Sequence, residues 1–191
     1  MSPAELIDCA MANPANAALL ERLPALGLPQ CHLVAGCLFQ AVWNAVSGQP
    51  PAAGVHDYDI FYFDGADLSW EAEDAVIRRI AALTADLGIM VEPRNQARVH
   101  LWYGERFGPG YPQLVSVNDA IDRYLVECTC IGIEVASGRL YAPYGLGDLA
   151  RGLLRINPHN ARPDLFVRKA ESYRARWPWL TIVNETPFQR D

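Results

Sequence analysis

Residues 56–64 read His56-Asp57-Tyr58-Asp59-Ile60-Phe61-Tyr62-Phe63-Asp64. Aromatic and β-branched residues favour an extended backbone, so this segment predicts a strand over residues 58–63. Alternate residues of a strand share one face and lie ~6–7 Å apart. Asp57 and Asp59 therefore present two carboxylates side by side where the strand begins.

Two adjacent carboxylates repel each other unless a cation lies between them. Mg²⁺ takes carboxylates together with phosphate oxygens and water, and a pair of such ions can clamp both oxygens of a phosphoryl-type displacement. That chemistry favours a third acid, and Glu92 on the next predicted strand (residues 89–92) is the best candidate. The sequence therefore predicts a Mg²⁺ (or Mn²⁺) site at Asp57, Asp59 and Glu92. The alternative for the paired acids is a solvated turn.

A glycine precedes a predicted helix upstream of these acids. The apolar run 31–35 predicts a short strand, and residues 38–46 carry apolar side chains at helical spacing. Glycine lets a backbone approach a phosphate closely, and a helix N-terminus attracts negative charge. Gly36 and Cys37 are therefore candidate phosphate-binding residues. The alternative is that Gly36 only ends a strand.

Polar residues also follow the predicted strand at 89–92, in the order Asn95-Gln96-Ala97-Arg98. Arg98, on a further predicted strand (98–103), suits contact with a triphosphate, and Asn95 or Gln96 suits a base or an acceptor. The alternative is that the two amides satisfy loop backbone while Arg98 pairs with a structural acid. The sequence leaves both interpretations open.

The remaining pattern mixes helices with short strands. Helices are predicted over residues 3–21 (broken at Asn13-Pro14), 70–87, 117–125, 147–155 and 164–176, strands over 128–135 and 139–141, and a loop over 104–111. This order favours an α+β (mixed α/β) fold, a small mixed β-sheet with helices packed mainly on one face. We expect a single domain over residues 1–191, with a core at about 31–145 and the helices at 3–21 and 147–176 as appendages.

Composition narrows the class of protein. The chain is 51% apolar and 20% charged with a net charge of −6, which is ordinary for a globular domain and makes extended nucleic-acid binding unfavourable, although a local basic cleft remains open. The odd cysteine count and scattered spacing argue against a disulfide framework. No signal peptide and no run of ~20 apolar residues is evident in the sequence. We therefore expect a cytoplasmic protein with no membrane partner.

Three segments carry a resemblance to a known family: residues 34–44 (VAGCLFQAVWN), 56–64 (HDYDIFYFD) and 91–103 (VEPRNQARVHLWY). Together they resemble an uncharacterised bacterial nucleotidyltransferase-like family of the DNA polymerase β-like superfamily, over about residues 34–179. The resemblance implies the nucleotidyltransferase (polymerase β-like) fold, metal-dependent nucleotidyl transfer, and metal carboxylates at Asp57 and Asp59. The superfamily usually has Gly-Ser or Gly-Gly where this chain has Gly36-Cys37, so a hydroxyl contact to the nucleotide phosphates is missing.

The first hypothesis is therefore an enzyme that moves a nucleoside monophosphate from an NTP to an unidentified acceptor bearing a hydroxyl or phosphate group. Its partners are the NTP and that acceptor. Two alternatives remain: a non-catalytic nucleotide-binding or protein-interaction module on the same fold, and a metal-dependent hydrolase that uses the same carboxylates.

Overall fold

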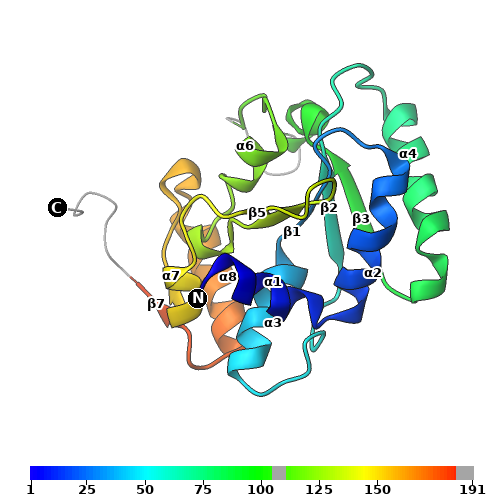
Figure 1. The fold of residues 1–191 in the computed structure, drawn as a ribbon. Coiled ribbons are helices and arrows are strands. Elements are labelled where there is room, and N and C mark those ends of the chain that lie inside the picture. Colours follow the sequence, from blue (N-terminus) through cyan, green and yellow to red (C-terminus); the bar gives the residue numbers. More distant parts are fainter. Residues whose placement is uncertain (105–110, 184–191) are drawn as a thin grey trace.

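A computed structural model describes residues 1–104 and 111–183. A five-stranded sheet in the order β3-β2-β1-β4-β5 forms its centre (Figure 1). The strands are β1 (His32–Val34), β2 (Tyr58–Tyr62), β3 (Val91–Asn95), β4 (Gly132–Glu134) and β5 (Leu140–Tyr141), with a separate pair β6 (Leu153–Leu154) and β7 (Thr181–Ile182). β2 and β3 are parallel, and the other neighbours in the five-stranded sheet are antiparallel, so the predicted mixed sheet is confirmed.

Helices connect and cover these strands. The α-helices are α1 (Pro3–Met11), α2 (Pro14–Arg22), α3 (Gly36–Val46), α4 (Trp70–Leu83), α6 (Val117–Ile121), α7 (Gly147–Arg151) and α8 (Pro163–Arg176), and the 3₁₀ helices are η1 (Leu23–Leu26), η2 (Ala85–Leu87), η3 (Gln96–Leu101), η4 (Glu127–Thr129) and η5 (Pro158–Asn160). Within the described residues, no helix is both long and apolar enough to cross a membrane.

The two faces of the sheet are buried differently. Leu33 pairs in register with Ile60 and Ile133, and all three belong to the large buried cluster that helices α1, α2, α3, α4 and α8 complete. The opposite face carries Val34, which joins a smaller cluster with residues of α6. Helices therefore cover mainly one face, as predicted, and the other face is left partly open beside α6.

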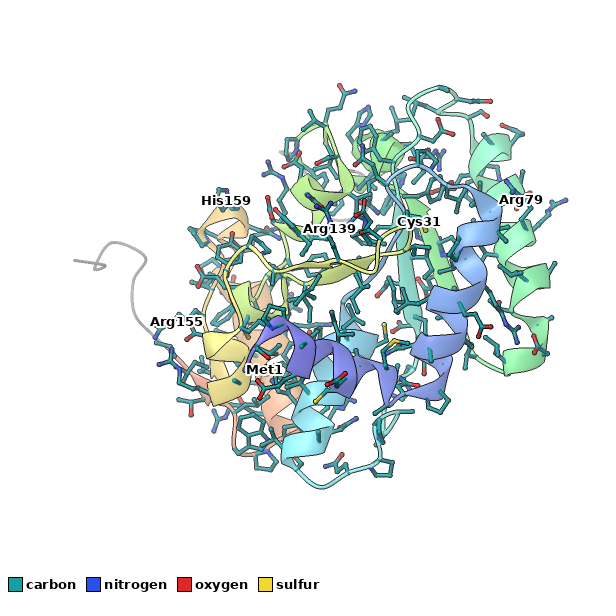
Figure 2. The ribbon with its side chains drawn as sticks, in the orientation of Figure 1. Met1, Cys31, Arg79, Arg139, Arg155 and His159 are labelled. Atoms are coloured by element: carbon teal, nitrogen blue, oxygen red, sulfur yellow. The ribbon has the colours of Figure 1, made fainter. Side chains whose placement is uncertain are left out.

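The helices at both ends of the chain share this core. Leu6, Leu19 and Phe166 belong to the same buried cluster as the sheet residues. Each such buried side chain contributes ~1.5–3 kcal/mol through the apolar surface it removes from water. Figure 2 shows Arg79 and His159 at the edge of the molecule. Cys31, just before β1, is buried, whereas Arg139 is exposed.

Several predicted boundaries were wrong. Residues 98–103 were predicted as a strand, but Gln96–Leu101 is the 3₁₀ helix η3, because the Asn95 side chain accepts a hydrogen bond from the Ala97 amide and caps it. Pro93 does not end the preceding strand. It pairs with Ile60 at the sheet edge, where proline is tolerated because no ladder hydrogen bond from its nitrogen is needed on the open side.

The other differences shorten elements. The helix predicted at 117–125 ends at Ile121, and the strand predicted at 128–135 is a 3₁₀ turn followed by Gly132–Glu134. The helix predicted at 147–155 ends at Arg151, because Gly152 adopts a left-handed conformation and the short strand β6 follows. Most of the loop predicted at 104–111 lies outside the described residues.

Gly152 has the most constrained glycine position in the described chain. Its φ is +68°, and a Cβ atom there would lie 2.3 Å from Cζ3 of Trp179. An alanine at position 152 would suffer both the backbone strain of a left-handed conformation and a steric clash with Trp179. Because these two effects add, we expect Gly152→Ala to lower the free energy of unfolding by ~2–5 kcal/mol in urea titrations. The control is Gly48→Ala, where φ is +65° but nothing lies within 4 Å, so only strain of ~1–2 kcal/mol is expected. Equal losses in the two variants would contradict the packing argument.

Candidate active site

A cavity of about 540 Å³ opens where β2 begins, and Asp57 and Asp59 line it. Tyr58 and Ile60 point into the core, so the alternation of the strand turns Asp59 and Phe61 to the opposite face. Asp57 precedes the strand on the same side. The sequence-predicted pair of carboxylates therefore faces one shared cavity.

The turn from β1 into α3 forms another part of the wall. Ala35 and Gly36 line the cavity, and Ala35 has φ +62° and ψ −131°, a backbone conformation that is strained for a residue with a Cβ. The Ala35 carbonyl already accepts the amides of Leu38 and Phe39. The amides of Gly36 and Cys37 begin the helix and have no carbonyl within it to pair with. This N-terminus therefore offers positive backbone dipoles to the cavity.

Cationic side chains outnumber carboxylates among the described lining residues. Arg94, Arg123, Lys169 and Arg176 line the cavity together with Asp57 and Asp59. Arg94 comes from β3, Arg123 from the segment after α6, and the other two from α8. An acidic protein thus contains a locally basic cleft, which favours an anionic ligand.

The pKa of Asp59 is raised to about 7 from its ordinary value of 3.8. Burial is the largest cause, followed by the charges of Asp57 and Glu92, whereas Arg94 and Lys169 act in the opposite direction. A buried carboxylate next to other carboxylates gains from a cation that neutralises it. The electrostatics of this wall therefore suit a cation beside Asp57 and Asp59.

A family model described as "Nucleotidyltransferase" matches residues 21–182 of the chain. The chain belongs to this nucleotidyltransferase family. No curated protein sequence matches it significantly.

Solved structures extend this finding. An NMR structure described as revealing a CCA-adding enzyme head domain is 25% identical, with a TM-score of 0.77, over 96% of this chain and 97% of the other. The apo form of a tRNA-processing enzyme is 14% identical, with a TM-score of 0.52, over 88% of this chain and 43% of the other, and this likeness concerns the fold alone. The fold of this chain is therefore that of a nucleotidyltransferase head domain.

Not all of the predicted residues reach the cavity. Gly36, Asp57, Asp59 and Gln96 line it. Cys37 does not, because its side chain is fully buried and its thiol donates to the Val34 carbonyl. Within the described residues, no three His, Cys, Asp or Glu side chains converge as a metal cluster.

Glu92 lies next to the carboxylate pair without lining the cavity. It is directly opposite Asp59 in the parallel pairing of β2 and β3. Its side chain is 38% exposed and forms an ion pair of 3.4 Å with Arg94, which does line the cavity. Glu92 therefore acts on Asp59 through its charge and holds a cavity arginine.

Asn95 and Arg98 are engaged in the fold. Asn95 is 2% exposed, and its side-chain amide bonds both the amide and the carbonyl of Asp64. Arg98 forms an ion pair with Glu73, which is 3% exposed, and lies over the ring of Trp70. Neither residue lines the cavity. Their placement matches the structural alternative that the sequence left open.

The most informative cavity residue that sequence reasoning missed is Lys169. It is the only lysine in the chain, among fifteen arginines. This was the one feature of the sequence that could have pointed to a role for Lys169. Its ammonium group lies 5.3 Å from the ring centroid of Tyr173, inside the cavity wall. Gln40 on α3 was missed as well, since it follows the helix-forming pattern without any distinctive motif.

Proposed function

We propose that this chain is a metal-dependent nucleotidyltransferase that moves a nucleoside monophosphate from an NTP to an acceptor hydroxyl or phosphate and releases pyrophosphate. The observation that carries the proposal is the shared cavity, in which two carboxylates lie with the N-terminus of α3 and a set of cationic side chains. A nucleoside triphosphate complexed with a divalent cation needs both kinds of group, carboxylates for the cation and cations for the phosphates.

The donor set fits Mg²⁺ (or Mn²⁺). Mg²⁺ is usually held by one or two carboxylates together with substrate phosphates and water, so Asp57 and Asp59 suffice without a cage of three acids. The raised pKa of Asp59 supports a cation at this position. When bound, the metal would supply electrostatic stabilisation of the charge that develops on the transferred phosphoryl group. We assign Glu92 the role of tuning the charge of Asp59 from the neighbouring strand.

The other cavity residues bind and orient the nucleotide and the acceptor. Gly36 and the α3 N-terminus hold phosphate oxygens through backbone amides, and Arg94 on β3 and Lys169 on α8 neutralise the triphosphate. Gln96 contacts the base or the acceptor. Asp57 or Asp59 accepts the proton of an acceptor hydroxyl.

One similar structure supports an order in which acceptors can be tested. A structure described as a CCA-adding enzyme head domain covers nearly the same length as this chain. We therefore place an RNA 3′ end first among the acceptors to be tested, with small-molecule and protein hydroxyls next. Because the net charge of the chain is −6, we expect it to contact only a short segment at the end of such an RNA.

We expect Asp57→Asn to abolish Mg²⁺-dependent pyrophosphate release from NTPs and to lose the thermal stabilisation that NTP and Mg²⁺ give the wild type, about 2.7 kcal/mol at a hundredfold excess over Kd. Asp57 lines the cavity and, within residues 1–104 and 111–183, its side chain forms no hydrogen bond or ion pair, so the variant should remain folded. The control is Asp8→Asn, which removes an exposed carboxylate from α1. NTP binding without pyrophosphate release, with all acceptors present, would indicate a non-catalytic nucleotide-binding module. Unchanged binding in Asp57→Asn would refute the site.

A further inference from the structure

Gln40 is a buried amide that faces the cavity from the second turn of α3. It is 8% exposed and lines the cavity. Its side-chain carbonyl Oε1 accepts a hydrogen bond of 2.6 Å from Nη2 of Arg176. Because a guanidinium can only donate, this contact fixes which end of the amide is the oxygen. The NH₂ group of Gln40 must therefore point away from Arg176.

That NH₂ group lies over the first residue of the helix. A Cβ atom built on Gly36 would be 2.6 Å from Nε2 of Gln40, so glycine leaves the space that the amide occupies. Across residues 1–104 and 111–183, Nε2 has no hydrogen-bond acceptor. A donor that is held in place and left without an acceptor, beside the free amides of a helix N-terminus, is arranged for a ligand.

Arg176 is itself held in position. Its Nη2 also donates to the Gly54 carbonyl at 2.8 Å, and its guanidinium lies 4.1 Å from the ring centroid of Trp177. Trp177 is 1% exposed and bonds Asn44 in the interior. The orientation of Gln40 is therefore determined by a chain of contacts that ends in the core.

We propose that Nε2 of Gln40 donates a hydrogen bond to a phosphate oxygen of the bound nucleoside triphosphate, and that Arg176 is the residue that orients it. The inference rests on the proposed function and specifies how the phosphates are held. Cys37 cannot supply a side-chain donor at this turn, since its thiol donates to the Val34 carbonyl. Gln40, one turn further along the same helix, takes over the contact that a hydroxyl at position 37 would otherwise make.

An anion is the ligand that fits this donor. The wall around it carries Lys169, Arg176 and the backbone dipoles of α3, and each of these favours negative charge. A neutral carbonyl of a nucleobase gains less from the same surroundings, because hydrogen bonds to charged acceptors are roughly twice as strong.

Two substitutions separate a phosphate donor from a structural amide. Gln40→Glu keeps the oxygen that Arg176 needs and turns the donor into a carboxylate oxygen, whereas Gln40→Met keeps the length and removes both polar ends. The probe is inorganic tripolyphosphate with Mg²⁺, titrated calorimetrically. We expect both variants to weaken binding, Gln40→Met about tenfold and Gln40→Glu about a hundredfold or more.

A structural role predicts the opposite order. If Gln40 only supports Arg176, Gln40→Met should be the more damaging change, because Gln40→Glu keeps the oxygen that Arg176 needs and adds only a general repulsion of the anion. That order would overturn the inference. Melting temperatures of the free variants show whether both are folded, and we expect Gln40→Glu to be the more stable because its carboxylate still accepts the Arg176 hydrogen bond, whereas Gln40→Met leaves that donor without an acceptor.

Gly36→Ala provides an independent variant, because its methyl group displaces the Gln40 amide without removing it. We expect a loss of tripolyphosphate affinity of about tenfold in the wild-type background and no further loss in Gln40→Met. Additive losses would contradict a shared contact, and absence of tripolyphosphate binding to the wild type would overturn the phosphate site. Binding of tripolyphosphate in the expected order, without pyrophosphate release from any NTP, would refute the proposed transfer activity and leave the anion contact standing.

Discussion

Asp59→Asn is expected to raise the melting temperature of the metal-free protein at pH 8 by roughly 5–10 °C while it lowers Mg²⁺-dependent transfer by about a thousandfold or more. The pKa of Asp59 is about 7 in the folded protein and 3.8 ordinarily. Between those values the folded state binds more protons than the unfolded state, so stability falls as pH rises through this window. Above pH 7 the buried charge of Asp59 lowers the free energy of unfolding by ~2–4 kcal/mol. A neutral amide at this position avoids that loss.

Thermal melts at two pH values test this explanation. At pH 4.5 the wild-type carboxyl is protonated in the folded state, so most of the advantage of Asp59→Asn should disappear. Mg²⁺ at pH 8 should stabilise the wild type more than the variant, because only the wild type gains a neutralising contact. A variant less stable than the wild type at pH 8, or a gain that does not change with pH, would show that burial of the Asp59 charge is not the cause.

Glu73→Ala is expected to lower the free energy of unfolding by ~3–5 kcal/mol, because it leaves the guanidinium of Arg98 without its partner. Glu73 is 3% exposed and Arg98 is 11% exposed, and the same carboxylate accepts the Asn95 amide at 2.8 Å. Replacing both charges in Glu73→Leu/Arg98→Met should cost less than Glu73→Ala alone, since no unpaired charge remains. Urea titrations of the three proteins measure the difference.

The same variants decide the role of Arg98. Because Arg98 lies outside the cavity, the folded double variant should bind NTP with wild-type affinity. A double variant that is folded but binds NTP more than about tenfold weaker would place Arg98 in the phosphate site after all. A double variant as unstable as Glu73→Ala would contradict the explanation by an unpaired charge.

The features that sequence reasoning predicted depend on local pattern. Strand β2 follows from the alternation of Tyr58, Ile60 and Tyr62 with Asp59, and this alternation alone turns the carboxylate away from the core. The helix after Gly36 follows from its apolar spacing. Glu92 was predicted on the next strand, and the parallel pairing of β2 and β3 in the structure sets it opposite Asp59. Local pattern therefore sufficed for β2 and for the acid pair.

The features that were missed depend on contacts between distant segments. The Asn95 side chain caps the 3₁₀ helix after it, and Glu73 on α4 also holds the backbone amide of Asn95 and the guanidinium of Arg98. Nothing within residues 95–103 encodes that second partner. Lys169 and Arg176 reach the cavity because α8 packs on α3, where Tyr173 contacts both Phe39 and Trp43. Such packing cannot be predicted from the spacing of apolar residues along a single helix.

The position of Lys169 has a practical consequence for labelling. Since no other lysine occurs in the chain, an amine-directed reagent finds one ε-amino group and the N-terminal α-amino group. The ε-amino group belongs to the cavity wall and the α-amino group precedes α1, outside it. A peptide-resolved mass shift at residue 169, with the N-terminus as internal reference, therefore reports cavity occupancy in unsubstituted protein. Every candidate nucleotide or acceptor can be ranked in this way by the protection it gives to a single atom.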